Sequence, residues 1–218
     1  MATLNATNLK HASSSSNNIV IAADGSTTIS GNATISGNAT ISGNATCSGT
    51  ATGFGGGKIL KIESFVYKGL SSAQSSSNAY MATPLVCSIT PSAANSKIYV
   101  AYSINIGMGN GFRSGATVYR DINSGGFSQL DTVRADASGS NQRLSHVANG
   151  PNQWTPDTLS QTFLDSPSYS VGNAISYKLY TWAESNGTMY VNRIAGHDTN
   201  SATYAVGVST MTLMEISA

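Results

Sequence analysis

A six-residue pattern of apolar and polar positions repeats along the chain from Thr28 to Gly53. The motif Ile-Ser-Gly-Asn-Ala-Thr begins at Ile29, Ile35 and Ile41, and a decayed fourth copy begins at Cys47. Every second residue is apolar or small, and the residues between them are Ser, Asn and Thr. This alternation is typical of an extended strand and not of a helix.

The repeat needs a packing partner, because one isolated strand cannot bury its apolar side. One chain could coil into a left-handed parallel β-helix, with about three hexapeptides in each coil. Alternatively, three chains could each supply one strand, so that Ile29, Ile35, Ile41 and Cys47 meet around a three-fold axis. We favour the trimer, since four copies give little more than one coil with open ends. A disordered linker would have no use for an isoleucine at every sixth position.

From Lys58 onward the pattern changes to short alternating segments typical of β-strands. The clearest is Lys97–Ile106, in which every second residue is Ile, Val or Tyr. Further strands are predicted at residues 60–66, 117–122, 175–183, 189–191 and 204–216. Asn186-Gly187, between two of these strands, predicts a β-hairpin. The fold class is therefore all-β, with a head of β-sandwich type that resembles a jelly roll.

These changes of pattern divide the chain into three segments. Residues 1–27 form an N-terminal attachment segment, in which a strand at Ile19–Ala23 enters a tight turn at Asp24-Gly25. Residues 28–57 form the repeat stalk and end in a Gly-rich neck. Residues 58–218 form the β-sandwich head.

Composition excludes several classes of partner. The chain has 218 residues and a net charge of +1, and only 10% of its residues are charged. This balance does not indicate binding to nucleic acid or to an anionic membrane. No apolar run is long enough for membrane insertion, and no signal peptide is visible, so we expect synthesis and assembly in the cytoplasm. Two cysteines do not form a disulfide framework.

Candidate chemistry is sparse. The three histidines, His11, His146 and His197, are far apart and form no cluster with metal-ligand spacing, so neither a metal nor another cofactor is expected. A trimer could still bring three copies of one histidine together at its axis, and that alternative stays open. No Gly-x-Ser-x-Gly motif is present, which leaves a serine hydrolase unsupported. Carboxylate pairs for glycosidic cleavage need a defined separation that the sequence does not reveal. The candidates are Asp131, Asp136, Asp157 and Asp165. We expect no enzyme activity, and polysaccharide cleavage is the third hypothesis.

The longest segment without strand periodicity runs from Arg134 to Gln161. Long loops of this kind in compact domains are usually functional. Its candidate receptor-binding residues are Arg143, Asn152, Gln153 and Trp154. The indole of Trp154 could stack on a sugar while the neighbouring amides donate hydrogen bonds, or it could be a core residue. Both interpretations remain open at this stage.

Several motifs resemble tail-fibre-like, receptor-binding appendage proteins of marine and cyanobacterial tailed bacteriophages. They comprise Ala2-Thr-Leu-Asn-Ala-Thr-Asn-Leu-Lys10, the hexapeptide repeats, Gly55-Gly-Gly-Lys-Ile-Leu60, Ser88-Ile-Thr-Pro-Ser92, Ser96-Lys-Ile-Tyr-Val100 and Met211-Thr-Leu-Met-Glu-Ile216. The resemblance covers both ends and the strand core, but not the segment from about residue 107 to residue 173.

The resemblance implies a virion protein whose N-terminus joins the particle and whose C-terminal head recognises a host surface glycan or protein. We therefore expect a homotrimeric appendage, bound through its N-terminus to a tail or capsid protein. The alternative is a capsid decoration or head-fibre protein with a structural role and no defined receptor. The host, the receptor and the virion partner are not readable from the sequence.

Overall fold

A computed structural model describes most of the chain from Lys58 onward and short stretches before it. The described residues are 8–9, 11–13, 15–16, 19–21, 23–24, 26–29, 32–35, 58–75, 78–109, 113–148, 153–197, 202 and 204–218. The chain divides into two compact units, Met1–Thr52 and Gly53–Ala218, which are described separately below.

The first unit contains a small antiparallel sheet in the order β1-β2-β3. Its strands are β1 (Asn8–Leu9), β2 (Ile19–Ile21) and β3 (Thr27–Ile29). Between β2 and β3 the carboxylate of Asp24 accepts a 2.9 Å hydrogen bond from the backbone N–H of Ser26. That bond lowers the pKa of Asp24. The predicted strand is thus confirmed at Ile19–Ile21, and the chain turns at residues 23 and 24, while Gly25 lies outside the described residues.

The predicted stalk core is described at two of its four positions. Ile29 ends β3 and pairs with Ile19, so the first repeat belongs partly to this sheet. The side chains of Ile29 and Ile35 are 48% and 63% exposed in the single chain. Ile41 and Cys47 lie outside the described residues.

The second unit consists of antiparallel sheets, which confirms the all-β prediction. In its described part, one sheet has the order β10-β8-β12-β6, and β9 also pairs with β8. The other sheet has the order β4-β14-β7-β13-β5, and β11 also pairs with β7. The strands of the first sheet are β6 (Met81–Ile89), β8 (Ser114–Ile122), β9 (Ser128–Gln129), β10 (His146–Val147) and β12 (Ile175–Ala183). Those of the second sheet are β4 (Ile59–Tyr67), β5 (Ser71–Gln74), β7 (Lys97–Met108), β11 (Asp157–Asp165), β13 (Thr188–Val191) and β14 (Ser209–Ile216). Two short 3₁₀ turns are η1 (Asp131–Val133) and η2 (Glu184–Asn186).

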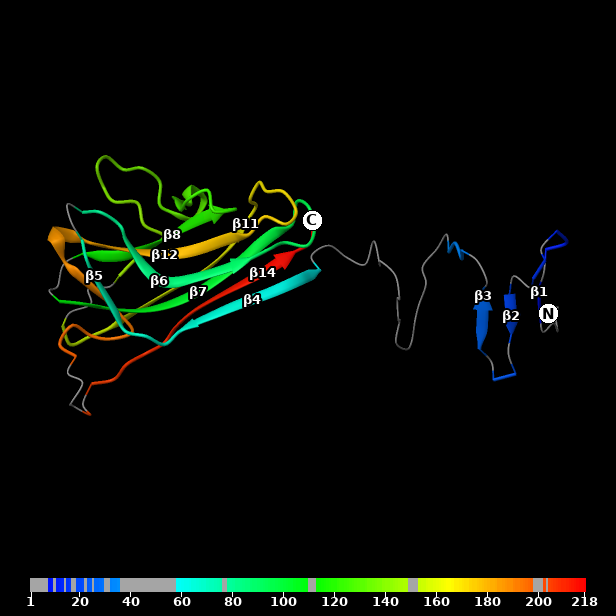
Figure 1. The fold of residues 1–218 in the computed structure, drawn as a ribbon, viewed down its shortest axis with the longest axis horizontal. Helices are drawn as coiled ribbons and strands as arrows, with labels where there is room; N and C mark the ends of the chain where they lie inside the picture. The colour runs from blue at the N-terminus through cyan, green and yellow to red at the C-terminus, as the bar shows by residue number, and fades with distance from the viewer. Residues whose placement is uncertain are drawn as a thin grey trace. The chain divides into compact units, whose positions relative to one another are not determined.

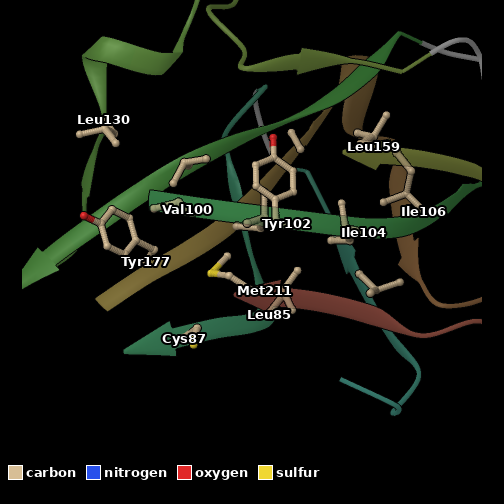
Figure 2. Close-up of a cluster of buried hydrophobic side chains, with 14 of the residues drawn as sticks. Leu85, Cys87, Val100, Tyr102, Ile104, Ile106, Leu130, Leu159, Tyr177 and Met211 are labelled. Carbon is tan, nitrogen blue, oxygen red and sulfur yellow. The ribbon is translucent and has the colours of Figure 1, made fainter. Parts of the chain in front are cut away.

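The two sheets share one hydrophobic core (Figures 1 and 2). Strand alternation explains it, because every second residue of β7, including Ile98, Val100 and Ile104, is fully buried. Leu85 from β6 and Met211 from β14 enter the same cluster from opposite sheets. Each fully buried aliphatic side chain stabilises the fold by about 1.5 to 3 kcal/mol.

The strand registers give this unit two distinct ends. At the entry end, the backbone N–H of Ser217 donates a 2.9 Å hydrogen bond to the carbonyl of Lys58. β4 runs away from that end over nine residues, or about 30 Å. At the opposite end, called the loop end, Tyr67 pairs with Ser209 and Met108 pairs with Met189. The segments that precede β8, β11 and β14 all lie there (Figure 1).

Buried carboxylates connect strands to loops. Glu215 is fully buried, and its oxygens accept hydrogen bonds of 2.8 to 3.0 Å from Ser92, Ala93 and Ser96. Burial raises the pKa of this carboxyl, but the N–H of Ser92 and the hydroxyl of Ser96 outweigh it, so the pKa falls below its ordinary value. Glu215 therefore fixes the loop between β6 and β7 at the entry end.

A second buried carboxylate, Asp165, lies at the end of β11. It accepts hydrogen bonds from Arg120 at 2.7 Å and from the Tyr177 hydroxyl at 2.6 Å. Burial, followed by the charge of Asp165, raises the pKa of Tyr177. The phenol therefore stays protonated and remains a donor to this pair.

Two parts of the predicted strand pattern are wrong. Asn186-Gly187 does not form a hairpin, because β12 belongs to one sheet and β13 to the other. Ser185 and Asn186 both have positive φ, at 55° and 60°, and turn the chain between the sheets. The segment without strand periodicity is also shorter than expected, since β11 begins at Asp157 and β10 interrupts the segment at His146–Val147.

Candidate binding site at the loop end

Two aromatic side chains stack at the loop end. Trp154 precedes β11 and Tyr204 precedes β14, and their ring centroids are 6.1 Å apart with an interplanar angle of 16°. The side chain of Trp154 is 57% exposed, so it is not a buried core residue. Parallel offset stacking holds both rings in a fixed orientation while leaving indole surface in contact with solvent.

A glycine permits the close approach of the indole. The backbone N–H of Gly196 donates a 3.0 Å hydrogen bond to the carbonyl of Gln153, which joins the two loops next to Trp154. A Cβ atom at position 196 would lie 2.7 Å from Cζ3 of Trp154 and would collide with the ring. Any larger residue at position 196 would therefore displace the indole.

A small hollow lies between the same loops. Its cavity volume is about 160 Å³, and it is lined by Asn105, Pro156, Asn192, Arg193, Ile194, Ala205, Val206 and Gly207. Pro156 is two residues from Trp154, and Ala205 follows Tyr204. Pockets for drug-sized ligands are typically about 300 to 1,000 Å³. The hollow is thus suited to one small unit of a larger ligand.

Asn192 fixes the floor of this hollow. Its side-chain amide donates 2.9 Å hydrogen bonds to the carbonyls of Tyr67 and Gly69, and its Oδ1 accepts a 2.6 Å bond from the hydroxyl of Ser209. Its own carbonyl accepts a bond from Gly207. With φ at 63°, Asn192 adopts the left-handed conformation that asparagine tolerates better than most residues. The hollow is therefore built on a rigid support.

The described charged residues at the loop end include Lys68 after β4, Asp157 at the start of β11, and Arg193, Arg113 and Glu184. The guanidinium of Arg193 lies 4.4 Å from the ring centroid of Tyr190, within the range of a cation–π interaction. Arg113 and Glu184 form an exposed ion pair at 3.5 Å. The hollow and the two stacked rings themselves offer aromatic surface, amides and one guanidinium, which are groups that recognise neutral polar ligands by stacking and hydrogen bonding.

The structure separates the sequence-predicted binding residues into two clusters. Gln153 and Trp154 lie at the loop end, and Asn152 is outside the described residues. Arg143 belongs to a different cluster, where its Nε donates a 2.7 Å hydrogen bond to the carbonyl of Ala135 and its Nη1 lies 3.6 Å from Asp131. These contacts hold residues 131–145 together, and the carbonyl of Arg143 accepts hydrogen bonds from the side chains of Gln129 and Tyr80.

Two of the four carboxylates considered for glycosidic cleavage have ionic partners elsewhere in the unit. Asp165 is buried against Arg120 and Tyr177. Asp131 forms ion pairs with Arg134 and Arg143. Within the described ranges, no three His, Cys, Asp or Glu side chains form a group that could hold a metal ion.

Comparison with known proteins gives no further guide to the site: no protein-family model matches the chain, and no curated protein matches it significantly. The described part of the chain also contains no helix with the length and apolar character needed to span a bilayer.

Sequence reasoning missed several residues of the loop end. Tyr204 was assigned to a strand, although β14 begins at Ser209. Gly196 and Asn192 carry no motif, and their roles depend on contacts with residues far away in the sequence. The only available signal was the pair of aromatic residues flanked by Gly, Pro, Asn and Ala, which is too common to identify a site.

Proposed function

We propose that the chain is a homotrimeric bacteriophage appendage that attaches to the particle through its N-terminal segment and binds the host surface through the loop end of its head. The exposed Trp154–Tyr204 pair carries this proposal, because it lies beside a hollow at the end of the unit opposite Lys58. The resemblance to tail-fibre-like proteins supports it independently. The ligand class is a host surface glycan or protein, with neutral sugars best matched to the groups present.

The connectivity of the second unit supports a jelly-roll head. Successive long strands alternate between the two sheets: β4, β7, β11 and β14 lie in one, and β6, β8 and β12 in the other. The first and last of these strands, β4 and β14, are neighbours. Jelly rolls use this kind of connection, and their end loops are free to vary.

The exposed stalk isoleucines support the trimer. A single chain leaves Ile29 and Ile35 largely exposed. Association of three chains would bury Ile29 and Ile35 of each chain around one axis and would place three loop ends on one trimer. Multivalent attachment can raise avidity by about 10² to 10⁴ over a single site, which suits weak stacking contacts.

The test compares adsorption of purified full-length chain and a Trp154→Ala variant to host cells and to a panel of neutral glycans. Removing a central aromatic contact costs about 2 kcal/mol, so we expect about 30-fold weaker binding per site. Val171→Ala is the matched control, because Val171 is also 57% exposed but lies in the turn between β11 and β12 at the entry end. Both variants should melt within a few degrees of the wild type.

Two results would contradict the proposal. If Trp154→Ala unfolds the head at lower temperature and binding follows stability, the indole is structural and the site assignment is wrong. If the wild-type chain neither binds cells nor slows adsorption of infecting particles, a capsid decoration role replaces receptor binding.

A further inference from the structure

The outer face of the sheet containing β4, β14, β7 and β11 carries no charged side chain over three successive rows of cross-strand partners. The row nearest the entry end is Ile62, Met214, Tyr99 and Leu164; the next is Ser64, Thr212, Ala101 and Thr162; the third is Val66, Thr210, Ser103 and Ser160. We call these residues the neutral face.

Side-chain geometry confirms that these residues share one side of the sheet. The hydroxyls of Ser64 and Thr212 are 3.2 Å apart, and those of Ser160 and Ser103 are 3.3 Å apart. The alternate residues of β7 and β14 are buried in the core, so the named residues must point the other way.

The neutral face exposes large apolar side chains. Ile62 is 56% exposed, Leu164 is 51% exposed and Val66 is 46% exposed. Ile62 and Leu164 lie at the two edges of the row that also contains Tyr99 and Met214. Contiguous apolar surface of this kind, with small residues between, is typical of the centre of a protein interface, where charge is depleted.

The outer face of the other sheet in the same unit is covered by the chain itself. Its outward Thr117 is fully buried, because Gln129 and Ser145 donate hydrogen bonds to its hydroxyl from the segment that follows β8. Trp182 is only 8% exposed on the same side. The chain therefore covers one outer face with its own loop, and in the described residues it leaves the neutral face bare.

We propose that the neutral face is the contact surface between heads of associated copies of this chain. A second copy is the occupant for two reasons. The proposed stalk trimer already brings other copies together, and copies joined through it are tethered by the segment before Lys58 at high effective concentration. A face without charge also meets a copy of itself without like-charge repulsion, and Ala101 and Ser103 at its centre permit close approach.

The inference rests on the association of chains in the proposed function. Different results would contradict the contact between heads and the trimer formed through the stalk. The experiment uses the full-length chain with Ile35→Asp and Ile41→Asp, which weaken the stalk contact and leave the neutral face intact. Sedimentation equilibrium of this stalk variant should still show association that depends on concentration. A stalk variant that is still monomeric at about 1 mM, the effective concentration that a short tether gives, would overturn the head contact and leave the stalk trimer standing.

Charge placed on the neutral face should then abolish that association. Leu164→Lys and Ile62→Lys, each added to the stalk variant, bury an unpaired ammonium and should raise the dissociation constant about 100-fold or more. Val147→Lys is the control, since Val147 is 67% exposed on β10 of the other sheet. If all three lysine variants associate equally, the neutral face is not the contact.

Methionine oxidation tests the same contact without any substitution in the neutral face, so a folding defect caused by such a substitution does not affect the result. Met214 lies in the neutral face and is partly exposed, whereas Met211 on the same strand is fully buried in the core. Peroxide should oxidise Met214 more slowly in the concentrated, associated stalk variant than in the dilute one, while Met211 stays protected in both. Equal oxidation of Met214 at both concentrations would contradict the proposal, and it would leave receptor binding through Trp154 unaffected.

Discussion

The outward side chains of the two sheets differ in how they are shielded from water. On the β8–β12 sheet, the chain covers the outward residues with residues 130–148, and the side-chain amide of Gln129 bridges Thr117 to the carbonyl of Arg143. Tyr119 and Tyr180 stack beneath that cover with centroids 3.8 Å apart. On the neutral face, no described segment takes the place of such a cover, and the outward residues are aliphatic or carry hydroxyls.

The difference shows what a single chain must provide for itself. A covered face can use polar side chains where the cover supplies partners at a fixed geometry, as Gln129 and Ser145 do for Thr117. The buried indole N–H of Trp182 is an exception, since it has no hydrogen-bond partner among the described residues. A face that binds another chain gains from residues that do not need a partner before association, such as Ile62 and Leu164. The kinds of residue on a sheet face therefore indicate whether its partner is internal or external.

The sharpest way to break this comparison is to shorten one leucine of the cover and one of the neutral face. Leu144 of the cover is 7% exposed and packs next to Gly115, while Leu164 is 51% exposed on the neutral face. Leu144→Ala should lower the free energy of unfolding by about 2 to 5 kcal/mol, because it leaves a cavity. Leu164→Ala in the dissociated chain should change it by about 0.5 kcal/mol or less. Denaturant unfolding of both variants at low concentration measures the two effects.

Equal losses of stability in the two leucine variants would contradict the assignment of one face as internal and the other as external. Leu164→Ala should have its main effect on association instead, as a higher dissociation constant in the stalk variant.

Acid provides a second test, because β14 has a buried carboxylate on its inward side and only uncharged residues of the neutral face on its outward side. Its inward Glu215 has a lowered pKa, so its contribution to stability is present above the ordinary carboxyl pKa and is lost as the pH falls through the lower folded value. We expect the melting temperature to fall on acidification below about pH 4.5, and Glu215→Gln to reduce that fall. At neutral pH, Glu215→Gln should cost about 1 to 3 kcal/mol, since it disrupts a charge-assisted set of hydrogen bonds.

The neutral face contains no titratable side chain apart from the phenol of Tyr99. Association of folded chains should therefore stay constant over the same acidic window, until the heads unfold. Dissociation that precedes unfolding, seen by sedimentation at several pH values, would place a titratable group in the contact.

The strands that the sequence predicted are those with a regular apolar alternation. β7 and β12 have Ile, Val, Leu or Tyr at nearly every inward position, so their periodicity is visible without a structure. β11 was missed because its inward positions include Gln161 and Asp165, and the polarity of Asp165 is tolerated only because Arg120 and Tyr177 bind it. β6 contains Pro84, a residue that argues against a strand in the sequence; β6 tolerates it because it lies at the edge of its sheet.

The candidate site was predicted only at Gln153 and Trp154. Trp154 meets Tyr204 because β11 and β14 both pair with β7 and begin at the same end of the unit. That proximity depends on long-range strand register, which local patterns do not encode. Arg143 shows a second limit of local pattern: its place in a long polar loop predicts binding, and that prediction is untested, but its contacts with Ala135 and Asp131 are not visible in the sequence.

The smallest expected effect concerns salt. Between about 0.01 and 1 M salt the Debye length falls from about 30 to about 3 Å, so contacts that depend on charge weaken strongly. A contact through the neutral face should keep its dissociation constant within about two-fold across this range, or tighten slightly as salt favours apolar burial. The Val147→Lys control should behave in the same way. In Leu164→Lys, by contrast, added salt should partly restore association, because it screens the like charges brought together on neighbouring copies. In the stalk variant with an unchanged neutral face, a dissociation constant that rises ten-fold with salt would mean that the contact uses charged residues outside the neutral face. The two sheets would then no longer differ in whether the partner of their outer face is internal or external.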